Sequence, residues 1–296
     1  MKLKLGTNLG FAVNRYIEPE IWAKIVAKDL GLSSVQFVAD LLNPFLPDDY
    51  INKMTGRIVN SVKEYGISVD SMFTSAYTRV NHLMHPDGDA REIWLNWFRR
   101  FLDIGQKFGA KTSGSHFGIL TFDGFGRNYE FLVEEGVKNW RKLTFHAKEL
   151  GYDSLIFEPM SVPREMAHTI PEAKELMDRV NAHCGVPMRL CLDVGHAPHP
   201  DYRDPYPWIE QLGRYSPIIH IQQTVLNKSN HAPFTAEQNK TGIITGEKLL
   251  NAMEKSGLDE TILMFEISHR EHYDTEFKII EDLKESAEYW RQWIKN

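Results

Sequence analysis

The chain has few cysteines and no long apolar run. Its 296 residues contain two cysteines, Cys184 and Cys191, which form no CxxC pair and offer no disulfide framework. We expect both to be buried thiols in a reducing compartment. Glycine and asparagine interrupt the amino-terminal stretch MKLKLGTNLGFAV, and no stretch of 18 apolar residues occurs. The sequence therefore predicts neither a secretory signal nor a membrane span, and we expect a cytoplasmic protein.

Positive charge is also scarce. The chain has 34 lysines and arginines against 40 acidic residues, which gives a formal net charge of -6. Nucleic-acid binders usually carry a basic surplus or stripe, so this balance disfavours such a partner. The 42% hydrophobic and 25% charged content is ordinary for a globular protein. No low-complexity segment, charge block or Pro/Gly/Ser-rich linker divides the chain, and we expect one domain spanning residues 1–296.

Short apolar strands alternate with longer helices along the sequence. Eight strand candidates span residues 2–8, 34–40, 68–75, 111–118, 154–159, 188–194, 217–224 and 261–268. Helix candidates with a period near 3.6 span residues 18–31, 89–109, 129–151, 170–183, 245–257 and 277–294. Each strand has room for a crossover helix and two loops after it, so we predict an α/β fold, a closed (β/α)8 TIM barrel. No GxGxxG follows the first strand, which disfavours a dinucleotide-binding sheet.

Acidic residues fall at the ends of several predicted strands. Glu158, Asp193 and Glu266 lie on strands five, six and eight, and His196 follows Asp193 in the stretch MRLCLDVGHA. The active site of a (β/α)8 barrel lies at the carboxyl ends of its strands. Bare carboxylates are costly in an apolar core, so such groups are paired, protonated or bound to a metal. The alternative is that each acid pairs with a nearby lysine or arginine at the barrel rim.

Strand seven adds an amide to this set. Side-chain alternation turns Ile219 and Ile221 toward the helices, so His220 and Gln222 face the barrel axis, with Gln222 nearer the mouth. Gln222 is therefore the candidate ligand and His220 a deeper core histidine. Three carboxylates and an amide oxygen form a hard site that suits Mn²⁺, Mg²⁺ or Co²⁺ better than zinc.

The same motifs carry a resemblance to a known superfamily. The stretches IFEP, LDVGH, HIQQT and MFE resemble the xylose-isomerase-like barrels, which include ketose 3-epimerases, hydroxypyruvate isomerase and the endonuclease IV branch. The stretches GTNLGFAVNRY, VQFVADLLNPF and SNHAPF resemble the bacterial branch that acts on four-carbon keto sugars, the tetrulose (erythrulose) phosphate epimerases and isomerases. The resemblance spans the whole chain.

This resemblance implies a metal site and roles for its residues. It implies one divalent ion, with Mn²⁺ favoured and Mg²⁺ or Co²⁺ as alternatives, held by Glu158, Asp193, Gln222 and Glu266. Many members have histidine where this chain has Gln222, and the hydroxypyruvate-isomerase type has glutamine. His196 resembles the histidine that hydrogen-bonds a substrate oxygen. The other candidates for substrate binding are His116, His231, Lys240 and Phe11.

The implied chemistry is proton transfer next to a ketose carbonyl. A metal on the carbonyl oxygen and neighbouring hydroxyl acidifies the adjacent C–H and stabilises an enediolate. Glu158 and Glu266 can approach the substrate from opposite sides. If one removes the proton and the other returns one to the opposite face, C3 is epimerised. If a single acid moves the proton between neighbouring carbons, the result is aldose–ketose isomerisation, and the sequence leaves both open.

Other functions compete for the same residues. Decarboxylation of a β-keto acid gives the same enediolate, with Lys240 or Arg270 as the cation near the leaving carboxylate; these two could equally hold a substrate phosphate. A non-catalytic sugar-binding barrel needs no acid pair. DNA cleavage of the endonuclease IV type needs a zinc cluster and an Asp-Arg-His run, where this chain has Ser229-Asn230-His231. We expect a small sugar substrate, no nucleic acid, no membrane and a tendency to homo-oligomers.

Overall fold

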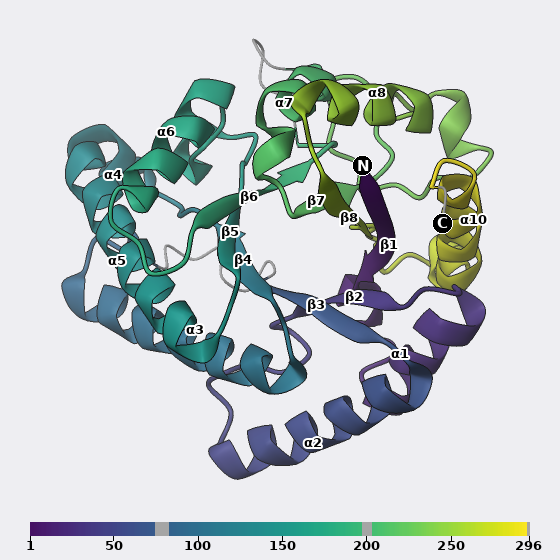
Figure 1. Ribbon diagram of the computed structural model, residues 1–296, viewed down its shortest axis with the longest axis horizontal. Coiled ribbons are helices and arrows are strands. Elements are labelled where there is room, and N and C mark those ends of the chain that lie inside the picture. Colours follow the sequence, from purple (N-terminus) through teal and green to yellow (C-terminus); the bar gives the residue numbers. More distant parts are fainter. Residues whose placement is uncertain (75–82, 197–202, 295–296) are drawn as a thin grey trace. The chain divides into compact units, whose positions relative to one another are not determined.

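A computed structural model describes residues 1–74, 83–196 and 203–294. Its eight parallel strands form a closed barrel in chain order, so the predicted (β/α)8 barrel is confirmed (Figure 1). All eight predicted strands are present, most of them ending earlier than predicted, and Ser75 of the third lies outside the described residues. The strands are β1 Lys2–Asn8, β2 Ser34–Val38, β3 Ser68–Phe73, β4 Thr112–His116, β5 Ser154–Glu158, β6 Met188–Asp193, β7 Ile218–Ile221 and β8 Glu260–Phe265.

The helices include six that were predicted and others that were not. The predicted helix over 18–31 is a short α1 followed by a π-helical turn, Ile25–Asp29. Helices α2, α4, α7 and α9 were missed, although Ile51, Met54, Ile58 and Val62 of α2 are buried at helical spacing. The helices are α1 Pro19–Lys24, α2 Asp48–Tyr65, α3 Gly88–Phe108, α4 Phe122–Arg127, α5 Tyr129–Leu150, α6 Ile170–Asn181, α7 Pro205–Leu212, α8 Gly246–Ser256, α9 Tyr273–Glu276 and α10 Ile279–Arg291.

By its internal contacts the chain divides into two compact units. The first comprises Met1–Gln36, Arg57–Val69 and Cys191–Asn296, and the second Phe37–Gly56 and Asp70–Leu190. The organisation as a single domain over residues 1–296 stays a prediction.

Within the first unit, parallel pairing aligns the last strands of the chain with the first. Strand β1 pairs with β8 from Lys2↔Glu260 to Thr7↔Phe265, and the two lie side by side in Figure 1. Strand β8 also pairs with β7, and β7 pairs with β6 up to the register Asp193↔His220. The carboxyl ends of β6, β7 and β8 therefore lie next to one another.

Within the second unit, β3, β4 and β5 pair in the same parallel manner. The register between β4 and β5 places His116 beside Glu158 at their carboxyl ends. Helix α3 contains a glycine, Gly105, at which a Cβ would lie 2.4 Å from the Tyr152 hydroxyl and 2.5 Å from Met72 Cγ. Glycine costs a helix about 1 kcal/mol relative to alanine. We infer that Gly105 is needed because α3 packs closely on β3.

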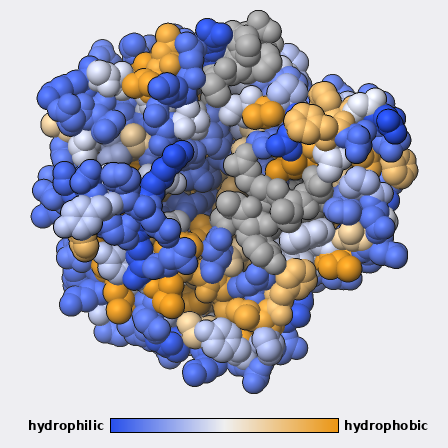
Figure 2. All heavy atoms as spheres, turned by 180° about the vertical axis from the view of Figure 1, so that it is seen from behind, coloured by the Kyte–Doolittle hydropathy of each residue, from blue (hydrophilic) through white to orange (hydrophobic). Residues whose placement is uncertain are grey.

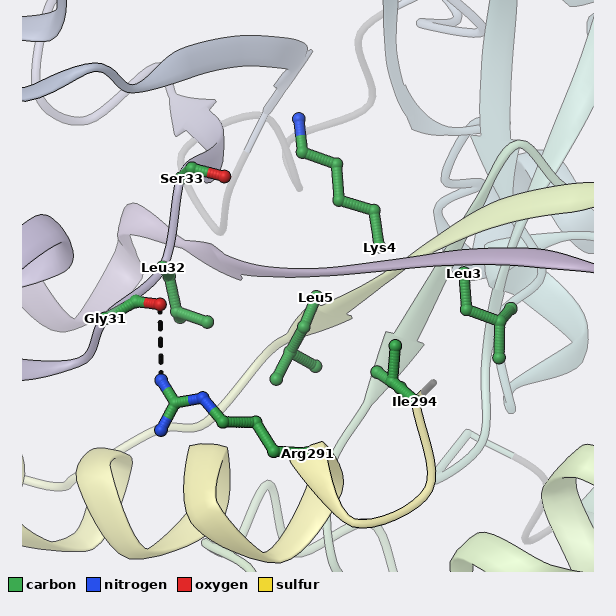
Figure 3. Close-up of a pocket in the computed structure, with 8 residues that line it drawn as sticks. All are labelled: Leu3, Lys4, Leu5, Gly31, Leu32, Ser33, Arg291 and Ile294. Carbon is green, nitrogen blue, oxygen red and sulfur yellow. Dashed lines mark hydrogen bonds between the residues drawn. The ribbon is translucent and has the colours of Figure 1, made fainter. Parts of the chain in front are cut away.

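A cavity of about 280 Å³ lies at the amino end of β1 in the first unit. Arg291 of α10 borders it and donates hydrogen bonds to the carbonyls of Leu30 and Gly31, the latter at 3.2 Å (Figure 3). The amino-terminal face of a (β/α)8 barrel contributes stability, and its chemistry is on the opposite face. The cavity therefore belongs to the packing of α10. Its lining residues are Leu3, Lys4, Leu5, Gly31, Leu32, Ser33, Arg291 and Ile294.

Hydrophilic residues predominate on the face drawn in Figure 2, where apolar residues form separate patches. The most exposed large apolar side chains are Phe122, Tyr273 and Phe277. Among the described residues, no helix combines the length and apolar character that crossing a membrane requires.

Candidate metal centre

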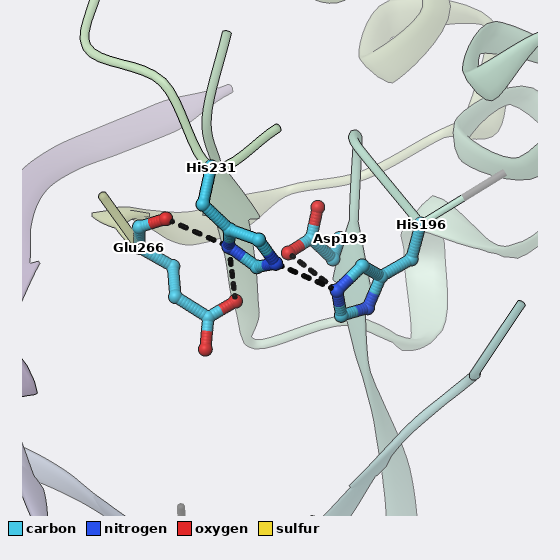
Figure 4. Close-up of side chains that lie close together, drawn as sticks. All are labelled: Asp193, His196, His231 and Glu266. Carbon is cyan, nitrogen blue, oxygen red and sulfur yellow. Dashed lines mark hydrogen bonds and ion pairs between the residues drawn. The ribbon is translucent and has the colours of Figure 1, made fainter. Parts of the chain in front are cut away.

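Four predicted site residues of the first unit converge at the ends of β6, β7 and β8. Asp193 ends β6, His196 follows it, His231 comes from the loop after β7, and Glu266 follows β8 (Figure 4). Each offers one ligand atom, and these atoms lie within 4.8 Å of one another. His196 Nε2 is 3.2 Å from His231 Nε2 and 3.7 Å from Asp193 Oδ2. His231 Nδ1 is 3.7 Å from Glu266 Oε2.

Gln222 lies against the same carboxylate. Its Nε2 is 3.0 Å from both oxygens of Asp193 and 3.0 Å from His231 Nδ1, and its Oε1 accepts the backbone N–H of His231 at 2.5 Å. The amide hydrogens thus occupy the position at which a cation would bind the Asp193 carboxylate. Oε1 can reach that position only if the amide gives up its hydrogen bond from the His231 N–H and turns by half a turn. Carboxylates with an amide oxygen within reach form a donor set that fits a hard divalent ion.

The loop after β7 is built around His231. His231 has a φ of 48°, a left-handed conformation that is uncommon for a residue with a side chain. An antiparallel bridge between Gln223 and Ala232 holds the loop, and Thr224 Oγ1 lies 2.6 Å from the Lys228 carbonyl. Such backbone conformations persist where the surroundings over-determine them, and they cluster at binding and catalytic sites. The loop therefore supports a functional position for the His231 ring.

The electrostatics of the cluster favour metal-binding protonation states. The Asp193 side chain is fully buried, and burial alone would raise its pKa. His196 and His231 beside it reverse this effect and hold the pKa of Asp193 well below its usual range. Burial lowers the pKa of His196, against the opposing attraction of Asp193. Ionised carboxylates and neutral imidazoles are the forms that bind metal ions.

Two predicted residues belong to the second unit. Glu158 ends β5 and is only 5% exposed. His116 ends β4, and its Nδ1 lies 3.1 Å from the hydroxyl of Ser115, which accepts a 2.6 Å hydrogen bond from Thr74. Both side chains therefore lie at carboxyl ends of strands, where the sequence predicts them.

The remaining predicted substrate contacts lie on loops and turns. Lys240 is exposed in the short turn Gln238–Lys240 and forms an ion pair with Glu237. Phe11 is buried in the 3-10 turn after β1, with its ring 6.3 Å from that of Tyr16. Arg270 is exposed after β8. Substrate roles for these residues stay predictions.

Sequence reasoning missed two buried amides next to the cluster. Asn8 at the end of β1 and Gln36 in β2 are buried, and Gln36 Oε1 lies 2.8 Å from His220 Nε2. His220 is fully buried, as expected of a core histidine, yet its Nδ1 is only 3.2 Å from Glu266 Oε2. The available signal was a single glutamine inside the apolar strand SVQFV.

The sequence as a whole matches a known family. Residues 25–293 match the family described as the xylose isomerase-like TIM barrel. The chain belongs to this family. The resemblance drawn from the strand-end motifs is thereby confirmed.

Proteins of similar length that this chain resembles include sugar epimerases. D-Erythrulose 1-phosphate 3-epimerase of Brucella abortus (strain 2308) is 34% identical over 301 residues, which cover 99% of this chain and 97% of that protein. A solved structure of a putative xylose isomerase from Rhodospirillum rubrum ATCC 11170 matches with a TM-score of 0.88 and 25% identity, covering 98% of this chain and 99% of that chain. D-Psicose 3-epimerase from Clostridium cellulolyticum H10, solved with D-tagatose, shares the fold at a TM-score of 0.73 and 17% identity, covering 99% of each chain. These relatives confirm the expectation of an enzyme among the sugar isomerases and epimerases.

Replacing Gly195 by alanine is expected to disturb the metal centre more than the fold. A Cβ at Gly195 would lie 2.2 Å from Gln222 Cδ and would push the amide away from Asp193. We expect Mn²⁺ affinity to fall about 10- to 100-fold, with a loss of about 1–3 kcal/mol in the free energy of unfolding. Calorimetric titration with Mn²⁺ and urea denaturation measure the two effects.

The matched control for this experiment is Gly126→Ala, because a Cβ at Gly126 has no neighbour within 4 Å. It should bind Mn²⁺ like the wild type. An unchanged Mn²⁺ affinity in folded Gly195→Ala would place Gln222 outside the metal centre.

Proposed function

We propose that the protein is a divalent-metal-dependent 3-epimerase of a four-carbon keto sugar phosphate. The observation that carries this proposal is the convergence of Asp193, Glu266 and Gln222 with His196 and His231 at the ends of three adjacent strands. D-Erythrulose 1-phosphate is the preferred candidate substrate, because a 3-epimerase of that compound aligns with this chain over nearly its full length.

The metal ligands in this proposal are Glu158, Asp193, Gln222 and Glu266, with Mn²⁺ favoured. Glu158 is included because it ends a parallel strand of the same closed barrel at its carboxyl end. The bound ion would supply positive charge that acidifies the C–H beside the ketose carbonyl and stabilises the enediolate.

The two glutamates carry the proton transfer. One carboxylate removes the C3 proton and becomes a carboxylic acid, and the other, initially protonated, gives its proton to the opposite face of C3. Exchange of protons with solvent then restores both groups. In this proposal His196 and His231 bind substrate hydroxyl oxygens, and Lys240 or Arg270 holds the phosphate.

The test is deuterium incorporation in D₂O by the Mn²⁺-loaded enzyme. C3 is the only stereocentre of erythrulose 1-phosphate, so its epimer is the mirror image and has an identical proton spectrum. The reaction must therefore be followed by loss of the C3 proton signal in recovered substrate together with decay of circular dichroism. We expect both with D-erythrulose 1-phosphate and a slower reaction with unphosphorylated erythrulose.

Different outcomes would favour the competing functions. Deuterium in an aldose product would indicate isomerisation. Release of carbon dioxide from a β-keto acid, without exchange in any ketose, would indicate a decarboxylase. A protein that binds Mn²⁺ and sugar but gives neither exchange nor release would be a sugar-binding barrel.

A further inference from the structure

A chain of buried hydrogen bonds leads from the backbone to His220, whose ring lies against Glu266. The N–H of Gly10 donates to Asn8 Oδ1 at 2.7 Å, and Asn8 Nδ2 donates to Gln36 Oε1 at 2.8 Å. His220 Nε2 lies 2.8 Å from the same oxygen, and His220 Nδ1 lies 3.2 Å from Glu266 Oε2. All of these residues belong to the first unit, and the side chains of Asn8, Gln36 and His220 are buried.

The direction of these hydrogen bonds is fixed by the first of them. A backbone N–H can only donate, so Asn8 must turn Oδ1 toward Gly10 and Nδ2 toward Gln36. Gln36 must then present Oε1, because its turned amide would set two donors against each other. His220 Nε2 meets that same oxygen and must carry a hydrogen. When the ring is neutral, Nδ1 is therefore the lone-pair nitrogen, and it faces Glu266 as an acceptor for a protonated carboxyl group.

The orientation of Gln36 is maintained at a cost. Its Nε2 is buried and has no hydrogen-bond partner among the residues that the structure describes. An unsatisfied buried amide group costs about 1–3 kcal/mol. In the other orientation of the amide, both hydrogen bonds to Gln36 Oε1 would be lost or reversed. The observed orientation is therefore kept although it leaves Nε2 without a partner.

We propose that Gln36 and Asn8 are positioning residues for Glu266, which act by fixing His220 in its Nε2–H tautomer. The Glu266 carboxylate then always faces the same atom of the His220 ring, held in the same orientation. This proposal rests on the proposed role of Glu266 in proton transfer. It assigns a function to two amides that lie outside the proposed set of metal ligands.

The sharpest test replaces one side-chain group by another of nearly equal size. Asn8→Asp keeps an oxygen for the Gly10 N–H but replaces the donor toward Gln36 by an acceptor. The Gln36 amide should then turn, so that Nε2 donates to the new carboxylate and to His220 Nε2. We expect the His220 proton to move from Nε2 to Nδ1. The readout is ¹⁵N NMR of histidine-labelled, Mg²⁺-loaded protein, with the His220 signals assigned from His220→Asn.

A second variant removes the network altogether. Gln36→Met has a similar length and neither accepts nor donates, so His220 should show a mixture of tautomers. We expect kcat for C3 exchange to fall about 10- to 100-fold with KM near the wild-type value. The control is Thr261→Val, which removes a buried 2.9 Å hydrogen bond to the Ser216 carbonyl at the amino end of β8. It should change neither the tautomer nor kcat.

The outcomes separate this proposal from the proposed function. A wild-type His220 protonated on Nδ1, or a tautomer unchanged in both Asn8→Asp and Gln36→Met, would overturn the network. If Gln36→Met loses the pure Nε2–H tautomer of His220 but keeps the wild-type kcat, the positioning role is overturned. The expected tautomers in an enzyme that exchanges no C3 proton would support the network and contradict the 3-epimerase.

Discussion

Replacing Glu266 by glutamine is expected to lower the rate of C3 epimerisation about 10²- to 10⁴-fold. Glutamine has nearly the same shape and keeps an oxygen toward the metal centre, but it cannot accept or return a proton. The side chain is partly accessible, follows β8 directly and lies next to His220 and His231. The measurement is circular dichroism decay of D-erythrulose 1-phosphate with Mn²⁺-loaded variant and wild type.

The matched variant Glu158→Gln sharpens this prediction. In the proposed mechanism the two acids act on opposite faces of C3, so each is the base for one mirror image of the substrate. A variant that lacks the base for a given mirror image cannot exchange the C3 proton of that mirror image. The variant that lacks only the returning acid still exchanges that proton and gives it back to the same face, so deuterium enters without inversion. The two variants should therefore show opposite preferences for the two mirror images.

Glu260→Gln is the control for both variants, because Glu260 is exposed at the amino end of β8. It should react at the wild-type rate. Folded Glu266→Gln that epimerises as fast as the wild type would remove Glu266 from the mechanism.

Replacing Asp193 by asparagine is expected to lower Mn²⁺ affinity roughly 10²-fold or more, because the loss of one partner of a buried charge pair costs about 2–5 kcal/mol. Asp193 is the most enclosed carboxylate of the cluster and is held ionised by its neighbours. Asparagine can still accept the 2.5 Å hydrogen bond from the Gly195 N–H. Without metal, the variant should unfold more easily than the wild type because it loses the charge that His196 and His231 favour, so the effect of the ion is read from the change that Mn²⁺ makes to each protein.

Thermal unfolding with and without Mn²⁺ measures this effect. A ligand at 100 times its Kd adds about 2.7 kcal/mol to the free energy of unfolding, so Mn²⁺ should raise the wild-type Tm and leave that of Asp193→Asn nearly unchanged. Asp259→Asn, exposed before β8, should respond to Mn²⁺ like the wild type. An equal rise of Tm in Asp193→Asn would place the ion elsewhere.

The barrel could be predicted from the sequence because its strands are apolar and its helices periodic. Strand β1 has the predicted bounds, 2–8. Strand β7 ends at Ile221, not at residue 224, because Gln223 leaves the ladder to pair with Ala232. Such a long-range bridge gives no local pattern. Helix α7 was missed because Pro205 and Pro207 in PYPWIEQL suggest a loop, although proline is well placed in the first turn of a helix.

The cluster was partly predictable for a related reason. Acids at the ends of apolar strands are visible in a sequence, so Asp193 and Glu266 could be named. Hydrogen-bond partners far apart along the chain cannot be inferred from local patterns, and Gln36 and His220 are separated by 184 positions. Nothing in the local pattern around His231 indicates its left-handed backbone conformation.

The pairing of the first strand with the last determines when the protein can begin to work. A ribosome makes about 5–20 residues per second, so β1 leaves it roughly tens of seconds before β8. Until Glu260–Phe265 has emerged, β1 lacks its partner on that side, and Asn8 and Gln36 have no Glu266 to position. The four residues of the cluster, Asp193, His196, His231 and Glu266, also all follow residue 190. A nascent chain therefore cannot capture its metal early, and the cation enters only when translation is almost complete.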